Sequence, residues 1–389
     1  MPHSSVPTVG PMLHPSVLYL AIGYAVGPGG LGIVDARLVE HGRVIEAIAE
    51  AALLVVLFAN GLELRLPPDR GAWRVPLRLG LVAAPIGAGL VAAIACLFFD
   101  ISFAGSLVLG AILAPTDGSL TGRVVPLHEG QSPTLRFALA GESLASTVVA
   151  LPLVLLGLGC IGRHELGTAW LRWLLIDVVW AAACALVAGV ALGWLAARGL
   201  RRLGRARASF VPQSLVLTGV LVAAYSCAVV AGGNGFLAVL AAGAVFGHAR
   251  RPAVAFTVAS TPRPAAFAHR AERVAKVAAL LLLGAMLGSV VPSFPAIAFA
   301  LIVLGVIRPA AVQLALRGLR LAEIERRTLA WFGVRRVASV FLLAHAVNQG
   351  LDRVLERELT TATLIVVAGS VMLHGLSATP LVSRSAGAP

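Results

Sequence analysis

The polar segments Ala114-Pro115-Thr116-Asp117-Gly118 and Gly141-Glu142-Ser143-Leu144-Ala145-Ser146-Thr147 interrupt apolar runs that are long enough to lie inside a lipid bilayer. An ionisable side chain at that depth is costly unless it is paired or hydrated, so Asp117 and Glu142 are candidate functional residues. Asp117 also follows a proline in a helix-breaking stretch. A broken helix with a buried carboxylate is how ion-coupled transporters build a site near the bilayer midplane. The two segments therefore predict a membrane protein with an internal polar site.

The composition is that of a chain that uses lipid as its solvent. Of the 389 residues, 58% are hydrophobic and only 13% are charged, and the mean hydropathy is +0.90. These values exclude an ordinary soluble protein. The formal net charge of +13 is carried almost wholly by arginine. Because the arginines cluster in short loops between apolar runs, they indicate membrane topology, and nucleic acid is not an expected partner.

The cysteines and the polar residues at membrane depth give no sign of a metal centre, a disulfide framework or an enzyme. No Cys-x-x-Cys spacing occurs among the four scattered cysteines, so no cofactor is expected. An enzyme inside the membrane would need a nucleophile beside a base or a metal cluster. Ser143 next to Glu142 is the only hint of one, and no cluster of histidine, cysteine and aspartate accompanies it.

Apolar runs of about 20 residues, the length needed to cross a bilayer, follow one another along the whole chain. They predict an all-α membrane protein with about twelve spans and one membrane domain over residues 1–389. The predicted spans are 15–34, 44–63, 75–98, 103–118, 134–159, 172–197, 212–231, 234–248, 273–291, 293–316, 328–349 and 359–382.

The distribution of arginine between the loops predicts the orientation. The loops after the even-numbered spans up to the tenth carry most of the arginines, and the loops after the odd-numbered spans carry few. The positive-inside rule then places the first set of loops, and both termini, in the cytoplasm. We expect a multi-pass protein of the inner (plasma) membrane.

Two of the predicted spans contain polar interruptions and run in opposite directions. The fourth span breaks at Pro115–Gly118, and the eleventh at Trp331-Phe332-Gly333-Val334-Arg335-Arg336. An offset of seven spans reverses the direction of the chain across the bilayer. This is what an inverted-topology repeat with two broken helices requires.

Asp117 is the strongest candidate for an ion ligand. Breaking a helix frees backbone carbonyl groups, and carbonyls with a carboxylate suit a small hard cation. Thr116 could add its carbonyl or its hydroxyl oxygen. The alternative is that Asp117 caps the end of the span in the cytoplasmic headgroup region.

Glu142 and Arg308 are each costly in lipid when alone, so a mutual ion pair between them is the economical prediction. Arg308 lies within the tenth predicted span, in Val306-Ile307-Arg308-Pro309. Removing one partner would leave an uncompensated buried charge. Glu142 is therefore expected to be structural rather than a transport site.

Ser143, Ser146 and Thr147 follow Glu142 at i, i+3 and i+4 spacing, which places their hydroxyls on one face of a helix. Two interpretations are open: the hydroxyls ligate an ion, or they bond to the backbone of their own or a neighbouring helix. Arg335, in the eleventh span, either anchors that span or faces the cavity of the core.

In this order, these residues resemble the monovalent cation:proton antiporters of the sodium/proton exchanger superfamily, in its bacterial NhaP-like branch. Nine short stretches carry the resemblance, and they run over nearly the whole chain. They are Gly27-Pro28 with Gly30-Leu31-Gly32, Phe58–Leu64, Leu113–Asp117, Gly141–Ser143, Ala150–Pro152, Gly235–Val239, Arg308-Pro309, Trp331–Ser339 and His374–Ala378.

The resemblance implies a homodimer with two subdomains that move against each other. An interface subdomain would comprise about 15–66 and 212–291, an ion-carrying core about 75–160 and 293–384, and a linker helix about 172–197. The core would slide against the interface subdomain and expose its site to each side in turn. The resemblance also implies that Thr116, Asp117 and Ser143 ligate the cation, and that Glu142 pairs with Arg308.

The chain departs from the family at a position that matters for proton exchange. The family motif in the fifth span reads Glu-Ser-x-x-Asn-Asp, and here Ser146 and Thr147 replace Asn and Asp. A carboxylate can hold a cation or a proton but not both, whereas a threonine hydroxyl does not titrate at physiological pH. Either Asp117 performs the exchange alone, or the substrate has changed, or transport has been lost.

The sequence therefore predicts a secondary active transporter that exchanges a monovalent cation, Na⁺ in the first place, for protons by alternating access. Its expected partners are the cation, the proton, the lipid bilayer and a second copy of the chain. The alternative is a transport-inactive or altered-substrate relative that acts as a membrane scaffold or regulator.

Overall fold

Each predicted span has a counterpart in the computed structural model, which describes residues 15–64, 70–116, 133–202, 212–249, 264–331, 333–335 and 337–386. Single helices form the first span, α1 (Pro15–Val26), the second, α2 (Leu38–Glu63), the fourth, α5 (Phe103–Ile112), and the fifth, α7 (Pro133–Cys160). The third span consists of η1 (Arg70–Trp73), α3 (Arg74–Arg78), η2 (Leu79–Ala83) and α4 (Ala84–Phe98). The sixth consists of η3 (Thr168–Trp170), η4 (Trp173–Trp180) and α8 (Ala181–Arg202).

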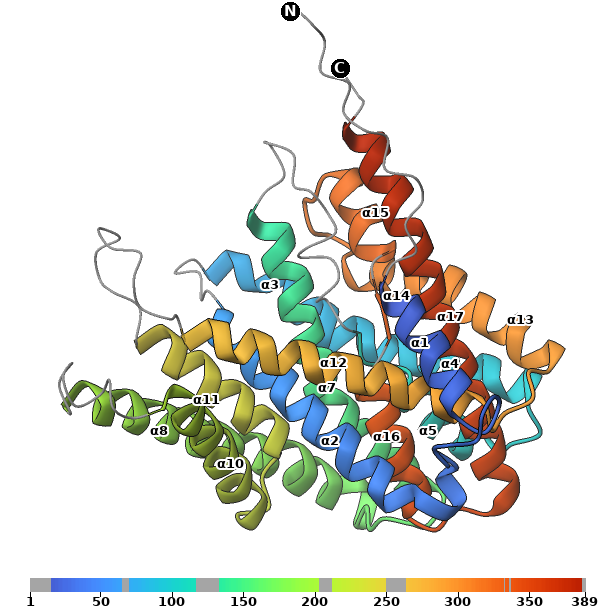
Figure 1. Cartoon of the computed structure of the whole chain (residues 1–389), viewed down its shortest axis with the longest axis horizontal. Coiled ribbons are helices and arrows are strands. Elements are labelled where there is room, and N and C mark those ends of the chain that lie inside the picture. The colour runs from blue at the N-terminus through green and yellow to red at the C-terminus, as the bar shows by residue number, and fades with distance from the viewer. Residues whose placement is uncertain are drawn as a thin grey trace, which may run out of the picture.

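The last six spans follow in the same way, and Figure 1 shows how the helices are arranged. The seventh, eighth and ninth are the single helices α10 (Gln213–Val230), α11 (Gly235–Ala249) and α12 (Pro264–Leu287). The tenth consists of α13 (Phe294–Ile302), η5 (Val303–Ile307) and α14 (Arg308–Ala315), and the eleventh of α15 (Glu323–Trp331) and α16 (Val337–Asn348). The twelfth is α17 (Arg353–Ala386).

The described helices confirm an all-helical membrane protein. By length and hydropathy, 7 of them can cross a membrane, and four shorter apolar helices accompany them. The shorter ones include α5 and α11, which match the two spans that the sequence predicts to be short. The first span is a correction. Its helix ends at Val26 instead of continuing to residue 34, because Gly27-Pro28-Gly29-Gly30 favours a turn over a helix.

The helix ends follow from local sequence. Ser102 begins α5 and accepts a hydrogen bond from the Gly105 N–H at 3.1 Å. Ser293 begins α13 in the same way, with a bond from Ala296. These hydroxyls satisfy backbone N–H groups that have no partner in the first turn of a helix. At its other end, α5 stops at Ile112, and Ala114–Thr116 continue without helical structure.

The broken helix lies in the centre of the bundle, where other helices shield it from lipid. In α5, Val108, Leu109 and Ile112 are fully buried. By contrast, only 17% of the most apolar stretch of the span Thr168–Arg202 is buried. Helices η4 and α8 therefore present apolar side chains to the outside. Irregular backbone is tolerated at membrane depth only where protein or a water-filled cavity surrounds it. The burial of α5 therefore makes its early end tolerable.

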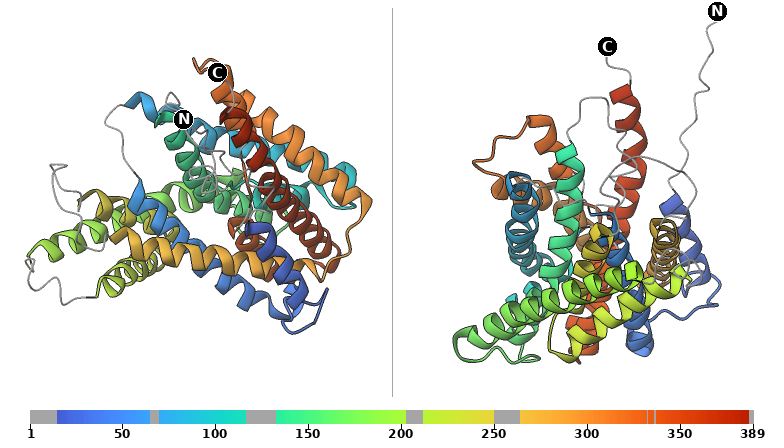
Figure 2. Two further views of the ribbon diagram at one scale, coloured as in Figure 1. Left: turned by 45° about the horizontal axis from the view of Figure 1, so that its top comes forward. Right: turned by 90° about the vertical axis from the view of Figure 1, so that its left-hand side faces the viewer.

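Helix α2 crosses the middle of the bundle and packs against α11, α12 and α16 (Figure 1). Small residues let it approach α11 closely, because a Cβ atom on Gly243 would lie only 2.6 Å from the Phe58 carbonyl oxygen. The beginning of α7 and the end of α17 project from the same side of the bundle (Figure 2, right). This arrangement sets α2 across from α5, α7 and α16.

Candidate cation site at the two helix breaks

The end of α5 is held against α7 by the side chain of Thr116. The Thr116 N–H donates to Ser146 Oγ at 3.3 Å, and its hydroxyl donates to Glu142 Oε1 at 3.2 Å. Thr116 is buried, as are both partners on α7. The backbone N–H that the end of α5 leaves without a helical partner is thus satisfied by a side chain of the neighbouring helix.

Glu142 and Arg308 form an ion pair inside the bundle. Arg308 Nη1 lies 2.5 Å from Glu142 Oε1, and the two side chains are 9% and 2% exposed. Arg308 Nη2 also donates to the Leu329 carbonyl oxygen at 3.2 Å, at the end of α15. One guanidinium therefore connects α14 to α7 and to the second broken span. Because the pair is so deeply buried, each charge depends on the other.

The second break lies between α15 and α16 and packs on that ion pair. A Cβ atom on Gly333 would lie 2.4 Å from Arg308 Nε, so only glycine fits against the guanidinium there. Trp331 closes α15, where its carbonyl oxygen lies 3.1 Å from His374 Nε2 of α17. Because His374 also faces the Ser370 carbonyl oxygen at 2.8 Å, its ring packs between two helices.

Arg335 brings a second positive charge to this region. Its side chain is buried, and its N–H donates to Ser370 Oγ at 3.1 Å. Within the part of the chain that the structure describes, its Nε and Nη1 have no hydrogen-bond partner. Its guanidinium interacts unfavourably with Arg308 and favourably with Glu142. Arg335 thus faces the core, and this part of the core has a positive bias.

The three hydroxyls of α7 have two different environments. Ser146 Oγ faces Thr116 and donates to the Ser143 carbonyl oxygen at 3.2 Å. Thr147 Oγ1 donates to the same carbonyl at 2.8 Å. Ser143 and Thr147 line a cavity, whereas Ser146 does not. The hydroxyl stripe is therefore divided between a packing contact and the wall of the cavity.

The cavity lies between α2, the end of α5, α7 and the start of α16. Its volume of about 20 Å³ has room for roughly one water molecule, or for an ion of that size. The hydroxyl-bearing residues Thr116, Ser143 and Thr147 line it, and Pro115 lines it beside them. The other lining residues are Leu53, Val56, Leu57, Asn60, Val337 and Ala338.

Asn60 is the polar lining residue that sequence reasoning about the site missed. It belongs to α2 and lines the cavity together with residues of α7. An amide oxygen is a good ligand for a hard cation, so Asn60 adds a neutral oxygen-bearing side chain to the lining. A signal was present, since Asn60 is a polar residue within an apolar span. The sequence alone does not say which helix face meets α7.

Two of the predicted site residues, Asp117 and Gly118, lie outside the described residues, as do Phe332 and Arg336. The remaining candidates come together around the two breaks. Thr116, Ser143 and Thr147 line the cavity, Ser146 and Glu142 contact Thr116, and Arg308 joins Glu142 to the end of α15.

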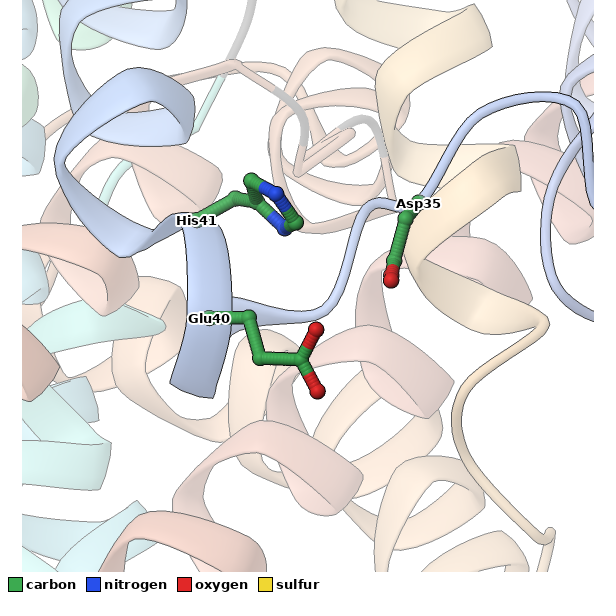
Figure 3. Close-up of side chains that lie close together, drawn as sticks. All are labelled: Asp35, Glu40 and His41. Carbon is green, nitrogen blue, oxygen red and sulfur yellow. The ribbon is translucent and has the colours of Figure 1, made fainter.

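A separate acidic cluster lies where the loop enters α2. Asp35 of the loop is close to Glu40 and His41 of the first turn of α2 (Figure 3). Arg37 already holds both carboxylates, with ion-pair distances of 2.6 Å to Asp35 and 2.9 Å to Glu40. The hydrogen bond from Arg37 lowers the pKa of Asp35 to about 2. Since an arginine occupies the carboxylate oxygens, this cluster is an ion-pair network of the loop.

Two helix breaks, one after α5 and one between α15 and α16, meet at one cavity inside the bundle. This is the arrangement of an ion-coupled membrane transporter. A model of the family described as "Sodium/hydrogen exchanger, transmembrane" matches residues 4–384, and the chain belongs to this family.

One relative is described as the K(+)/H(+) antiporter NhaP of Alkalimonas amylolytica. It is 26% identical over 381 residues, which cover 94% of this chain and 61% of that protein. Two solved structures of the sodium proton antiporter MjNhaP1 from Methanocaldococcus jannaschii are also similar. One, at pH 8, has a TM-score of 0.71 at 18% identity and covers 93% of each chain. The other has a TM-score of 0.73 at 18% identity and covers 96% of this chain and 91% of its own. The likeness to MjNhaP1 establishes the shared fold.

Proposed function

We propose that this chain is a secondary transporter of the plasma membrane that exchanges a monovalent cation for protons. The observation that carries the proposal is the cavity at the end of α5, which the buried hydroxyl-bearing residues Thr116, Ser143 and Thr147 line inside an apolar bundle. Neutral oxygen atoms at a broken helix are suitable ligands for a small hard cation. Membership of the sodium/hydrogen exchanger family supports the same reaction.

The proton is assigned to Asp117, because the cavity wall offers hydroxyls and an amide that do not titrate. Exchange needs a group that holds either the cation or a proton, and a carboxylate does so. Asp117 follows Thr116 directly in the sequence. Thr116 and Ser143 would ligate the cation with Asp117, and Thr147 and Asn60 would complete the shell. The roles of Ser146, Glu142 and Arg308 would be to hold the end of α5, α7 and α14 together.

The movement that we propose is alternating access between two groups of helices. An interface subdomain (about 15–66 and 212–291) would stay fixed in a homodimer, and a core (about 75–160 and 293–384) would slide against it. The helices around residues 172–197 would link the two. The termini would lie in the cytoplasm, as the arginine-rich loops suggest. The cavity lies where α2 meets α5, α7 and α16, which is where such a movement would open it.

We propose Na⁺ as the first cation to test, with K⁺ as the alternative. The family is described as sodium/hydrogen exchangers, whereas the relative from Alkalimonas amylolytica is described as a K(+)/H(+) antiporter. Neutral ligands alone distinguish the two ions weakly. The choice therefore depends on the fit of the cavity and on the carboxylate.

A second candidate function, that of a transport-inactive membrane scaffold or regulator, is favoured by one observation. Thr147 donates its hydroxyl to the backbone of its own helix, at the position where the family resemblance calls for a titrating aspartate. A protein that has lost exchange would keep the fold and the Glu142–Arg308 pair. It would have no need of Asp117.

The test is proton antiport in everted vesicles from a host that lacks its own sodium exchangers. The collapse of a preformed pH gradient is measured on addition of Na⁺, K⁺ or Li⁺ for the wild type, Asp117→Asn and Thr147→Asp. Asp100→Asn is the matched control, because Asp100 is an exposed carboxylate near the other end of α5.

Activity in the wild type and in Asp100→Asn that is lost in Asp117→Asn would support exchange at this cavity. A silent wild type that gains activity in Thr147→Asp would instead favour the scaffold. Equal activity in all four proteins would contradict the assignment of the proton to Asp117.

A further inference from the structure

A second polar cluster joins α2 to α16 away from the cavity. Glu46 of α2 lies 2.8 Å, through Oε1, from His345 Nδ1 of α16. Its other oxygen accepts a hydrogen bond from Asn348 Nδ2 at 2.5 Å. The Glu46 and His345 side chains are each 22% exposed, so the pair is only partly buried. Asn348 also lies close to the backbone of α2, where a Cβ atom on Gly42 would be 2.4 Å from its Oδ1 atom.

The cluster and the cavity lie along one contact between the same two helices. On α2, the residues Glu46, Glu50, Leu53, Leu57 and Asn60 follow at intervals of three or four, so they share one face. The last three of them line the cavity. Because Glu46 and Leu53 are seven residues apart, the cluster lies about 10 Å from the nearest lining residue of α2, measured along the helix.

Helix α16 repeats this arrangement, and an aromatic layer separates its two ends. Val337 lines the cavity, and Phe341 and His345 follow at intervals of four residues. Phe341 is buried; its ring stacks on His345 with a centroid distance of 5.8 Å and contacts Phe236 at 4.9 Å. From this end, the route to the cavity is therefore closed first by the polar cluster and then by an aromatic side chain.

We propose that Glu46, His345 and Asn348 form a latch that holds α2 against α16 and closes the outer route to the cavity. The proposal rests on the proposed function, in which α2 belongs to the fixed subdomain and α16 to the moving core. Opening the cavity on this side would require the two helices to separate, and the latch is their polar contact at that end. The topology predicted from the arginines places this end of α2 on the outer side.

The latch occupies both carboxylate oxygens of Glu46. Oε1 faces His345 Nδ1 of α16, and the other oxygen accepts from Asn348 of the same helix. Glu50, one turn further along α2, instead accepts a hydrogen bond from Tyr225 of α10. The polar contact of Glu46 is therefore directed at α16, and removing any of its three members weakens the hold of α2 on α16.

The test measures how fast a reagent in the external medium reaches the cavity. A reporter, Leu57→Cys, is placed in a background where serine replaces the four native cysteines. Modification by a membrane-impermeant maleimide is followed in spheroplasts at one fixed pH, without an ion gradient. The latch variants are Glu46→Gln, His345→Gln and Asn348→Ala. Glu50→Gln is the matched control, because Glu50 is on the same helix face but bonds to Tyr225 of α10 rather than to α16. Rates are compared at the same pH, so that the titration of the thiol itself cancels.

With the latch intact, modification of Leu57→Cys should be slow. Each latch variant should be modified about tenfold faster than the Glu50→Gln control, the factor expected when a hydrogen bond to a carboxylate is lost. Equal rates in all proteins, or faster modification only in everted vesicles, would overturn the latch.

The reporter does not depend on transport, so this result is separate from the antiport assay. Faster modification of the variants in a protein without antiport would keep the latch and remove the proposed exchange. If antiport depends on Asp117 but the modification rates are equal, the proposed exchange is kept and the latch is removed. Elution as a monodisperse peak in detergent shows that each variant is folded, and the three latch variants disturb the contact independently.

Discussion

Two carboxylates, Glu142 on α7 and Glu46 on α2, lie in the same bundle but have different kinds of partner. Glu142 is 2% exposed and pairs with Arg308, an arginine that stays charged at any physiological pH. Glu46 is 22% exposed and contacts His345 and Asn348 of α16. The first pair is dry and permanent, and the second is partly exposed and easier to break. The comparison shows how one bundle can hold some helices together and leave others free to separate.

The difference follows from the cost of leaving a charge alone. In the dry region neither Glu142 nor Arg308 can lose its partner without leaving a buried charge, so this contact resists any movement of α7 relative to α14. In the region near the surface, water can replace either partner, so the contact is weaker and can be broken at low cost. A movement between helix groups is therefore expected at the α2–α16 contact and not at the α7–α14 contact.

The largest expected effect is on the dry pair. Arg308→Met should lower the free energy of unfolding by about 3–5 kcal/mol, because Glu142 would be left as an unpaired buried charge. Thermal unfolding of the purified protein in detergent, followed by tryptophan fluorescence, measures the loss. The double variant Glu142→Leu with Arg308→Met should recover most of it, since no lone charge remains. A loss below about 1 kcal/mol in Arg308→Met would contradict the description of this region as dry.

The next effect concerns the space around the same guanidinium. Gly333→Ala would place a Cβ atom 2.4 Å from Arg308 Nε. Because Arg308 is held by Glu142 and Leu329, it cannot move away freely, and overpacking of this kind costs about 1–3 kcal/mol. Gly89→Ala is the control, since a Cβ atom there meets nothing within 4 Å. The same unfolding measurement should show a loss only for Gly333→Ala, and equal stability of the two variants would show that Arg308 is loosely held.

A smaller difference is expected within the hydroxyl stripe of α7. Ser146→Ala removes the acceptor of the buried Thr116 N–H, and an unsatisfied buried donor costs about 1–3 kcal/mol. Thr147→Val removes only a bond to the backbone of its own helix, which contributes less to stability. Thermal unfolding should therefore rank Ser146→Ala below Thr147→Val. In the vesicle assay, Thr147→Val should reduce antiport more than Ser146→Ala does, because of these two residues only Thr147 lines the cavity. The reverse order of stability would place Ser146, not Thr147, at the cavity wall.

The smallest effect on stability should be at the latch. Glu46→Gln should change the free energy of unfolding by less than about 1 kcal/mol, because the pair is partly hydrated. The rate at which an external maleimide modifies Leu57→Cys should nevertheless rise about tenfold, because the contact between α2 and α16 is weakened. A destabilisation as large as that of Arg308→Met would remove the contrast between the two carboxylates.

Much of the fold could be predicted from the sequence, because the bilayer imposes its own length on each apolar run. The twelve spans and the break after Ala114 follow from hydropathy and from Pro115 and Gly118. The cost of a lone charge in lipid was enough to associate Glu142 with Arg308, although the two are far apart in the chain. The early end of α1 at Val26 was not predicted, because apolar residues continue beyond the glycines of the turn.

The parts of the site that could not be predicted depend on how helices rotate against one another. The sequence does not say that Asn60 faces α7, since any face of α2 is compatible with its apolar composition. Glu46 and His345 are 299 residues apart, and neither lies at the centre of a span where its cost would demand a partner. The division of Ser143, Ser146 and Thr147 between cavity and packing contact depends on the exact approach of the end of α5.

The most direct measurement of the central claim is cation binding at the cavity, read as stabilisation of the purified protein. A ligand that binds only the folded state raises the unfolding temperature, and the stabilisation grows with the logarithm of its concentration above Kd. Unfolding is measured in NaCl, KCl and choline chloride at equal ionic strength, for the wild type, for Ser143→Ala with Thr147→Val, and for the control Ser106→Ala. Ser106 is a buried hydroxyl that bonds to Cys96 and does not line the cavity. The account predicts stabilisation by Na⁺ or K⁺ over choline in the wild type and the control, and its loss in the double variant. Equal stabilisation of the wild type and the double variant would contradict it.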